Sequence, residues 1–112
     1  MYKADKRLKT IYLRYNREAF DGTLPTDTEV GWNDELKDKM YGITLGIADE
    51  DTKHLFFQIH VNEELRRWPE VVRLTLLHEM NHIYLYPYMK HGKRFEEAMV
   101  RLAGRGMFKG LW

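Results

Sequence analysis

The stretch Leu76-Leu77-His78-Glu79-Met80-Asn81-His82-Ile83-Tyr84 decides how the rest of this 112-residue chain is interpreted. It contains the pattern His-Glu-x-x-His, and the four-residue spacing places His78 and His82 on the same face of a helix. Two imidazoles one turn apart can bind a single metal ion. The flanking residues are apolar on nearly every side, so the polar side chains need a reason to lie there. The stretch therefore predicts a buried helix that carries part of a metal site.

Zinc is the metal that this motif leads us to expect. Because the chain contains no cysteine, its ligands must be histidines and carboxylates. Catalytic zinc is usually held by three side chains at about 2.0–2.2 Å, with one position open to water. Zinc lowers the pKa of that water to about 7, so the adjacent Glu79 can take its proton and pass it to a leaving amine. The pattern therefore favours hydrolysis, although by itself it leaves open an ordinary amphipathic helix with surface histidines.

Length and composition predict one globular domain over residues 1–112 with a single core. No apolar run approaches the roughly 20 residues that cross a bilayer, and the basic N-terminus is not followed by the apolar stretch of a signal peptide. We therefore expect a cytoplasmic protein with no membrane segment. The absence of cysteine excludes disulfides and thiol nucleophiles.

Charge is distributed unevenly along the chain, although the formal net charge is only +1. Residues 1–20 carry six basic and two acidic side chains, residues 21–53 are strongly acidic, and residues 78–112 are basic again. Basic ends that converge in space would form a patch for an anionic partner such as DNA. A solvated surface is the simpler alternative, and both interpretations stay open.

The N-terminal part predicts a helix followed by a short strand. Apolar side chains recur at helical spacing between Lys3 and Phe20: Leu8, Ile11, Tyr12, Tyr15 and Ala19. Asp21-Gly22 can end this helix, and Leu24-Pro25 favours an extended exit. A strand is expected at Glu29–Trp32, and the polar residues that follow, up to Lys39, indicate a loop or a single helical turn.

Two alternating segments after this loop predict an antiparallel hairpin. They cover Met40–Ala48 and Leu55–Val61 and are joined by an acidic turn. On the first segment, Gly42 and Gly46 leave one face with little side chain. Such a face indicates either the close approach of another backbone or a bulge.

Three histidines lie outside the motif. His54 and His60 alternate with apolar residues in the second segment, and we expect them to be exposed strand residues rather than ligands. His91 follows His82 after eight intervening residues, just before a last predicted helix that ends near Ala103. This position makes His91 the natural candidate for the third zinc ligand.

The motif helix is expected to begin at Pro69 and to run to about Tyr86, where Pro87 stops it. Three tyrosines follow the second histidine: Tyr84, Tyr86 and Tyr88. One of them could donate a hydrogen bond to a tetrahedral oxyanion, but packing is the simpler use. The last residues, Gly104–Trp112, are expected to fold back as an extended tail.

Three segments together resemble the SprT-like zinc metallopeptidases, the family that includes Spartan. Tyr15–Pro25 resembles the end of the family's first helix, Leu76–His82 its active-site helix and His91–Phe95 its His-Gly-x-x-Phe element. The resemblance implies a compact α+β zincin. With the element pattern, it predicts an N-terminal helix, a small three-stranded antiparallel sheet, the motif helix and a C-terminal helix.

The resemblance also implies a polypeptide substrate and a catalytic base, Glu79. It implies three zinc ligands: His78, His82 and His91. A glutamate ligand from the last helix, Glu96 or Glu97, stays open as a replacement for His91.

Two functions are therefore expected. The first is a zinc-dependent endopeptidase, which by the resemblance would act on DNA-associated proteins. The second is a zinc-stabilised module, catalytically weak or inactive, that binds nucleic acid or a protein. Family members commonly add a cysteine zinc ribbon or DNA-binding segments, and residues 1–112 contain neither. Any DNA contact is therefore expected from the basic ends, Lys3–Arg17 and Lys90–Lys109.

Overall fold

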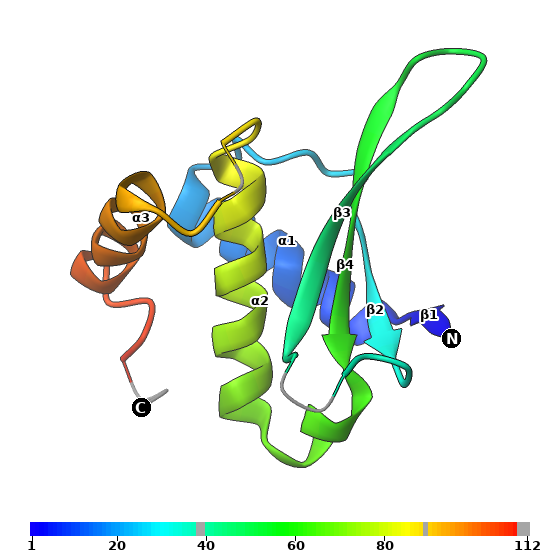
Figure 1. Cartoon of the computed structure of the whole chain (residues 1–112). Coiled ribbons are helices and arrows are strands. Elements are labelled where there is room, and N and C mark those ends of the chain that lie inside the picture. The colour runs from blue at the N-terminus through cyan, green and yellow to red at the C-terminus, as the bar shows by residue number, and fades with distance from the viewer. Residues whose placement is uncertain (38–39, 89, 110–112) are drawn as a thin grey trace.

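A four-stranded sheet and two helices form the two main layers of this α+β fold (Figure 1). The structure is a computed structural model that describes residues 1–37, 40–88 and 90–109. The elements in chain order are β1 (Tyr2–Ala4), α1 (Lys6–Phe20), β2 (Glu29–Asn33), β3 (Gly42–Ala48), β4 (Leu55–Asn62), η1 (Glu63–Arg67), α2 (Pro69–Tyr84) and α3 (Lys93–Gly104). Helices α1 and α2 cover one face of the sheet, and α3 lies against α2 on the side away from the sheet. Within the described ranges, no helix combines the length and apolarity that a membrane span needs.

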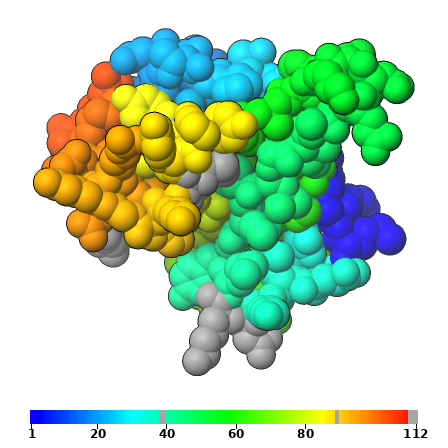
Figure 2. Space-filling view, turned by 45° about the horizontal axis from the view of Figure 1, so that its top comes forward, coloured from blue at the N-terminus to red at the C-terminus, as the bar shows by residue number. Residues whose placement is uncertain are grey.

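Strand β4 occupies the centre of the sheet, whose order is β1-β2-β4-β3. Its residues Phe57, Ile59 and Val61 are at most 5 % exposed and belong to the core, so the most apolar strand takes the most buried position. β3 pairs with β4 antiparallel, as predicted, but β2 pairs with β4 in parallel. The predicted three-stranded antiparallel sheet is therefore wrong in the orientation of one strand and in the number of strands. β3, with two glycines, has little to bury and lies at the edge, where the tip of the hairpin projects from the body (Figure 2).

Strand β1 has no counterpart among the predicted elements, since three residues are too few to show alternation. It pairs antiparallel with β2. The chain leaves the sheet at Asp5, whose carboxylate accepts hydrogen bonds from the backbone N–H groups of Arg7 (2.8 Å) and Leu8 (3.0 Å). This cap starts α1 at Lys6 rather than at the predicted Lys3.

His60 is buried, contrary to the expectation that it is a solvated strand residue. β1 covers it, because the ring of Tyr2 stacks on the imidazole with the centroids 4.2 Å apart. Gly31 leaves the room for this stack, since a Cβ at that position would clash with the Tyr2 ring and with the carbonyl oxygen of Lys3. Alternation predicts which face His60 occupies, but it does not predict the strand that buries this face.

The end of α1 is held from two directions. Asn16 is 3 % exposed and makes two hydrogen bonds of 3.0 Å to Leu24: its amide nitrogen donates to the carbonyl, and its amide oxygen accepts from the backbone N–H. Arg101 and Arg105 donate to the carbonyl oxygen of Ala19 at 3.2 and 3.1 Å. These bonds satisfy groups that the last turn of a helix leaves free. Part of the basic charge near the C-terminus therefore serves packing.

The residues after α3 fold back onto the core. Arg105–Lys109 form turns rather than the predicted extended tail, and Phe108 is 3 % exposed within the core cluster. A large apolar side chain at this point gains more by covering the core than by remaining in an extended tail. Residues 110–112 of the predicted tail, like residues 38 and 39 of the predicted loop, lie outside the described residues.

Candidate metal centre

Helix α2 turns both histidines of its motif toward the loop that precedes α3. The helix begins at Pro69, as predicted, and ends two residues before the predicted Tyr86. Its rotation is set by the core, because three side chains of its buried face are 0 % exposed: Leu76, Leu77 and Met80. His78 and His82 then lie one turn apart, between the core and the surface.

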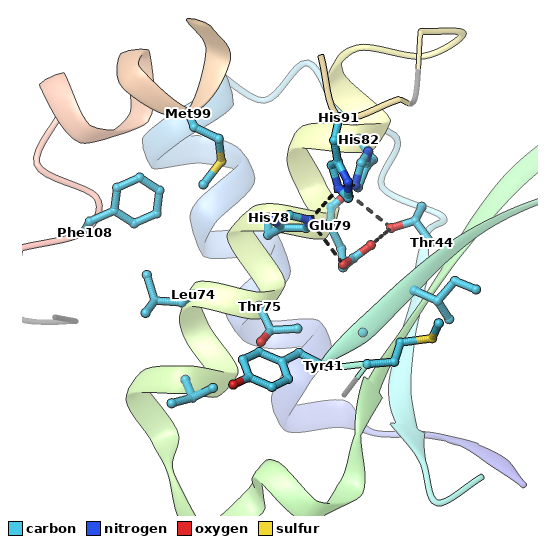
Figure 3. A pocket seen from close by; sticks show the side chains of 14 residues that line it. Tyr41, Thr44, Leu74, Thr75, His78, Glu79, His82, His91, Met99 and Phe108 are labelled. Atoms are coloured by element: carbon cyan, nitrogen blue, oxygen red, sulfur yellow. Dashed lines mark hydrogen bonds and ion pairs between the residues drawn. The ribbon is translucent and has the colours of Figure 1, made fainter. Parts of the chain in front are cut away.

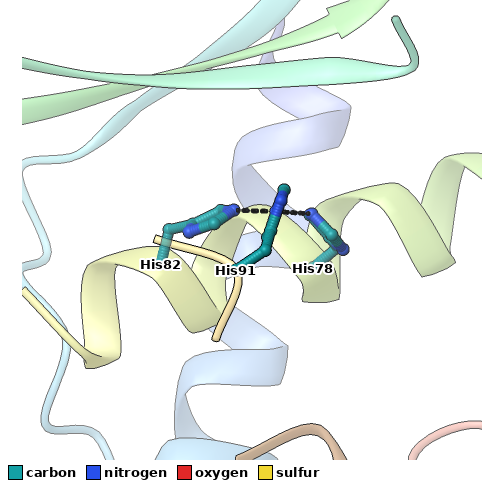
Figure 4. A group of neighbouring side chains, drawn as sticks. All are labelled: His78, His82 and His91. Carbon is teal, nitrogen blue, oxygen red and sulfur yellow. Dashed lines mark hydrogen bonds between the residues drawn. The ribbon is translucent and has the colours of Figure 1, made fainter. Parts of the chain in front are cut away.

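His91 approaches the two motif histidines from the loop before α3 (Figure 4). Its Nε2 atom lies 3.0 Å from Nε2 of His78 and 2.9 Å from Nε2 of His82. The ring of Phe95, in the first turn of α3, contacts all three imidazoles with centroid distances of 4.7 to 4.8 Å. The structure thus brings the three predicted ligands together and supports them with one aromatic ring.

The three histidines could hold a metal ion. Their ligand atoms all lie within 4.8 Å of one another, and they form the one such group found among the described residues. A tetrahedral zinc ion with bonds of about 2.0–2.1 Å separates its nitrogen ligands by roughly 3.3 Å. The Nε2 separations of 3.0 and 2.9 Å from His91 lie within a few tenths of an ångström of this distance. Burial, together with the neighbouring imidazoles of His82 and His91, lowers the pKa of His78 to about 4. His78 is therefore neutral at pH 7, as a metal ligand must be.

Glu79 lies beside this cluster with its carboxylate held from the sheet (Figure 3). Its Oε2 atom is 3.9 Å from Nε2 of His78, and its Oε1 atom accepts a hydrogen bond of 2.7 Å from the hydroxyl of Thr44 on β3. Burial raises the pKa of Glu79 to about 7, and the hydrogen bond from Thr44 opposes part of this rise. A carboxyl group with such a pKa can both accept and release a proton near neutral pH.

Gly42 allows β3 to come close to α2 at the carboxylate. A Cβ at this position would lie 2.8 Å from Cγ2 of Thr75 and 3.4 Å from Cγ of Glu79. The pairing of β3 with β4 is continuous from Gly42 to Ala48, so the glycine marks a close approach and not a bulge. Gly46, the other glycine on this face, would make only ordinary contacts, of 3.5 Å or more, through an added Cβ.

A cleft of about 820 Å³ opens over the metal centre. It is lined by β3 and the residues just before it, by α2, and by Met99 and Phe108 from the C-terminal part. In the space-filling view, the olive surface of α2 is visible between the teal of β3 and the orange of α3 (Figure 2). His78, Glu79, His82 and His91 all line this cleft, so the metal centre is open to a ligand from solution.

The other residues considered as ligands lie away from the cluster. Glu96 and Glu97 are exposed on α3 and do not belong to the metal-binding group among the described residues. His54 is exposed, as expected, and its Nε2 lies 2.7 Å from a carboxylate oxygen of Asp27.

The three tyrosines after the motif make packing contacts and are not among the described residues that line the cleft. Tyr84 packs on Phe20 with the centroids 5.5 Å apart, and Tyr86 makes an edge contact with Phe57 at 5.3 Å. The guanidinium of Arg94 lies 3.8 Å from the ring centre of Tyr88. These contacts favour packing over an oxyanion role.

Thr44 is the member of the site that the sequence did not point to. Its one signal is its position between Gly42 and Gly46, as the polar residue on the thin face of β3. Strand periodicity places it on that face. That the face packs on Glu79 becomes evident only from the arrangement of sheet and helix.

A helix with His-Glu-x-x-His, a third histidine from the next loop and an edge strand beside the glutamate define a small α+β protein with three histidines that could hold a metal ion. The chain belongs to the SprT-like family, whose sequence model matches residues 8–108, nearly the whole chain. The SprT-like domain is associated with a metallopeptidase-like zincin fold. Searches of curated proteins and of solved structures found no match to this chain.

Proposed function

We propose that this chain is a zinc-dependent endopeptidase that hydrolyses polypeptides by Glu79-assisted attack of water. One observation carries the proposal: a buried carboxylate lies beside three histidine Nε2 atoms in an open cleft. Membership of the SprT-like family supports it. The three histidines would hold zinc, which would lower the pKa of a bound water and polarise the scissile carbonyl group.

Glu79 provides the proton transfers in this proposal. Its Oε1 atom is engaged by Thr44, which leaves Oε2, on the side of His78, to accept the proton of the attacking water. The raised pKa of Glu79 favours keeping that proton until the leaving amine can take it. Glu79 thus acts first as a base and then as an acid.

Strand β3 provides the surface on which a substrate would lie. It is an edge strand of the sheet, so its outer backbone groups can pair with an extended peptide. Thr44 and Gly42 of the same strand contact the carboxylate region of α2. A peptide added along β3 therefore passes the metal centre, which is the geometry that hydrolysis of an internal peptide bond requires.

The test combines metal analysis with hydrolysis of an unfolded protein such as casein. We expect about one zinc ion per chain in the parent, and in Glu79→Gln unchanged zinc and unchanged folding but hydrolysis lowered by about 100-fold or more. His54→Ala, at an exposed histidine outside the cleft, serves as the control that leaves both unchanged. A parent that binds no zinc, or a Glu79→Gln variant as fast as the parent, would contradict the proposal.

A zinc-stabilised module that binds nucleic acid is the competing function. It is favoured by the meeting of the two basic ends, because Arg101 and Arg105 lie against the end of α1, which exposes Arg14 and Arg17. Strongly salt-dependent DNA binding that Glu79→Gln leaves unchanged, without hydrolysis of any tested protein, would support the module over the peptidase. Hydrolysis of DNA-associated proteins that DNA accelerates would instead support a peptidase with DNA as its partner.

A further inference from the structure

The cleft continues past the metal centre into a region that the zinc chemistry does not use. We call this region the apolar subsite, and its lining residues are Tyr41, Val71, Leu74, Met99 and Phe108. In Figure 3, Leu74, Met99 and Phe108 lie on the side of His78 away from Thr44. His78 therefore stands between the two parts of the cleft, as a candidate metal ligand on one side and a wall of the subsite on the other.

Helix α2 supplies both parts of the cleft from a single stripe. Val71, Leu74 and His78 follow one another at spacings of three and four residues, so they share one face of the helix. This face changes from apolar to metal-binding within two turns. Val71 and Leu74 are only half-buried, and Tyr41, which also lines the subsite, is 58 % exposed. Apolar side chains left accessible around a cleft indicate a ligand that covers them.

Charged groups are confined to the metal end of the cleft. Among the described residues that line it, Glu79 is the one acidic residue, and none is a lysine or an arginine. A charged substrate side chain in the apolar subsite would lose its hydration and find no oppositely charged partner among the described residues of the subsite. A large apolar side chain would instead be stabilised by leaving water, and it would also cover the exposed apolar lining.

We propose that the apolar subsite binds a large aliphatic or aromatic side chain of the substrate, on a residue that flanks the scissile bond. The peptidase would then select bulky apolar residues at this position and reject charged ones. This inference rests on the proposed function for the meaning of the scissile bond. The subsite itself is a feature of the cleft and can be tested without hydrolysis.

The first test measures binding to the zinc-loaded protein of short peptide hydroxamates, which anchor on the metal through the hydroxamate group. The residue next to that group is Leu, Phe, Ala or Lys, and the peptides are otherwise identical. We expect the Leu and Phe compounds to bind at least about 10-fold more tightly than the Lys compound, because an apolar pocket discriminates by this order. Leu74→Lys should abolish the preference. Val100→Lys on α3 is the matched control, because Val100 is 71 % exposed and is not among the described residues of the cleft.

The second test needs neither hydrolysis nor a hydroxamate. Methionine methyl groups are observed by NMR in the protein as purified, with any bound metal left in place, while N-acetyl-leucinamide or N-acetyl-lysinamide is added. The methyl signals of Met40 and Met99, which line the cleft, should shift with the leucine compound and not with the lysine compound. Met80, which is 0 % exposed in the core, is the internal control.

Any one of three results would overturn the inference. The Leu and Lys hydroxamates could bind with affinities within about two-fold of each other, or Leu74→Lys and Val100→Lys could lose the preference for leucine equally. The third such result is an equal shift of the methionine methyl signals with both amides. If Leu74→Lys does not fold by circular dichroism, Tyr41→Lys takes its place at an exposed position of the same subsite. A retained leucine preference in a parent that hydrolyses no protein would support the subsite and overturn the proposed function. Hydrolysis of proteins without any side-chain preference would support the proposed function and overturn the subsite.

Discussion

Thr44 contributes one hydroxyl group to the candidate site, and this hydroxyl determines where the carboxylate of Glu79 lies. The hydroxyl oxygen of Thr44 is 2.7 Å from Oε1 of Glu79 and 3.3 Å from the backbone carbonyl oxygen of Glu79. Thr44→Val keeps the branched shape and removes the donor. We expect the variant to bind zinc normally and to lose about 10-fold or more in kcat with little change in KM, because hydrogen bonds to charged groups contribute about 1.5–3 kcal/mol. Steady-state hydrolysis of a peptide substrate provides the measurement.

Thr44→Ser separates the hydroxyl from the packing of the side chain. It retains the donor and should recover most of the kcat that Thr44→Val loses. In a Glu79→Gln background, Thr44→Val should have little further effect, since the group that it positions is gone. Equal losses in the Ser and Val variants would show that Thr44 acts only by filling space.

The approach of β3 to α2 depends on a missing side chain at Gly42. Gly42→Ala places a methyl group 2.8 Å from Cγ2 of Thr75 on α2 and 2.9 Å from the carbonyl oxygen of His60 on β4, so β3 must shift relative to one or both neighbours. We expect a loss of about 1–3 kcal/mol in the free energy of unfolding, in the range typical of overpacking. Gly46→Ala on the same face is the control and should change stability by less than about 0.5 kcal/mol. Urea unfolding of both variants measures the difference, and equal losses would contradict the close approach.

The docking of β1 on the sheet makes stability sensitive to acid through His60. Burial lowers the pKa of His60 below its ordinary value, and the N-terminal charge adds to this effect. In the unfolded chain, His60 titrates at about 6.5, so below this pH the unfolded state binds a proton that the folded state resists. The stability associated with neutral His60 is therefore complete above about pH 6.5 and decreases as the pH falls toward the lower folded-state pKa.

His60→Phe tests this dependence, because it keeps a ring to stack on Tyr2 and removes the titrating group. The parent should lose more stability than the variant between pH 7 and pH 5 in urea unfolding. Other histidines, such as His78 with its lowered pKa, titrate in both proteins and cancel in the comparison. Parallel pH profiles of the two proteins would contradict the prediction.

The elements with a strong repeating pattern could be predicted, and the contacts between distant elements could not. The stripe of α1, the motif helix and the β3–β4 hairpin each follow from local spacing. The parallel pairing of β2 with β4 depends on which strand gains most from the central position, and the burial of His60 depends on a three-residue strand. Both are tertiary outcomes. The same limit explains why the proximity of His91 to His82 could be predicted from their spacing, whereas the contact of Thr44 with Glu79 could not.

Zinc should stabilise the fold as a whole, because the three histidines join α2 to the loop before α3. The two helical regions are also joined by a long hydrogen bond, 3.4 Å from the amide nitrogen of Asn81 to the carbonyl oxygen of Phe95, and by the guanidinium of Arg101, which lies 4.7 Å from the ring centre of Tyr84. A ligand that binds only the folded state, at 100 times its Kd, adds about 2.7 kcal/mol to the free energy of unfolding. For a chain of this size, we expect the Tm to fall by about 10 °C when a chelator removes the metal.

Hydrogen exchange shows where this stabilisation acts. Removal of zinc should increase exchange first in α3 and its preceding loop, while α1 and β4 keep their protection, because those elements belong to the core rather than to the metal cluster. His91→Ala should lose the response of the Tm to zinc, and His54→Ala, at an exposed histidine outside the cluster, should keep it. A Tm that is insensitive to chelator in a zinc-containing parent, or a zinc response retained in His91→Ala, would show that the metal does not link α2 to α3.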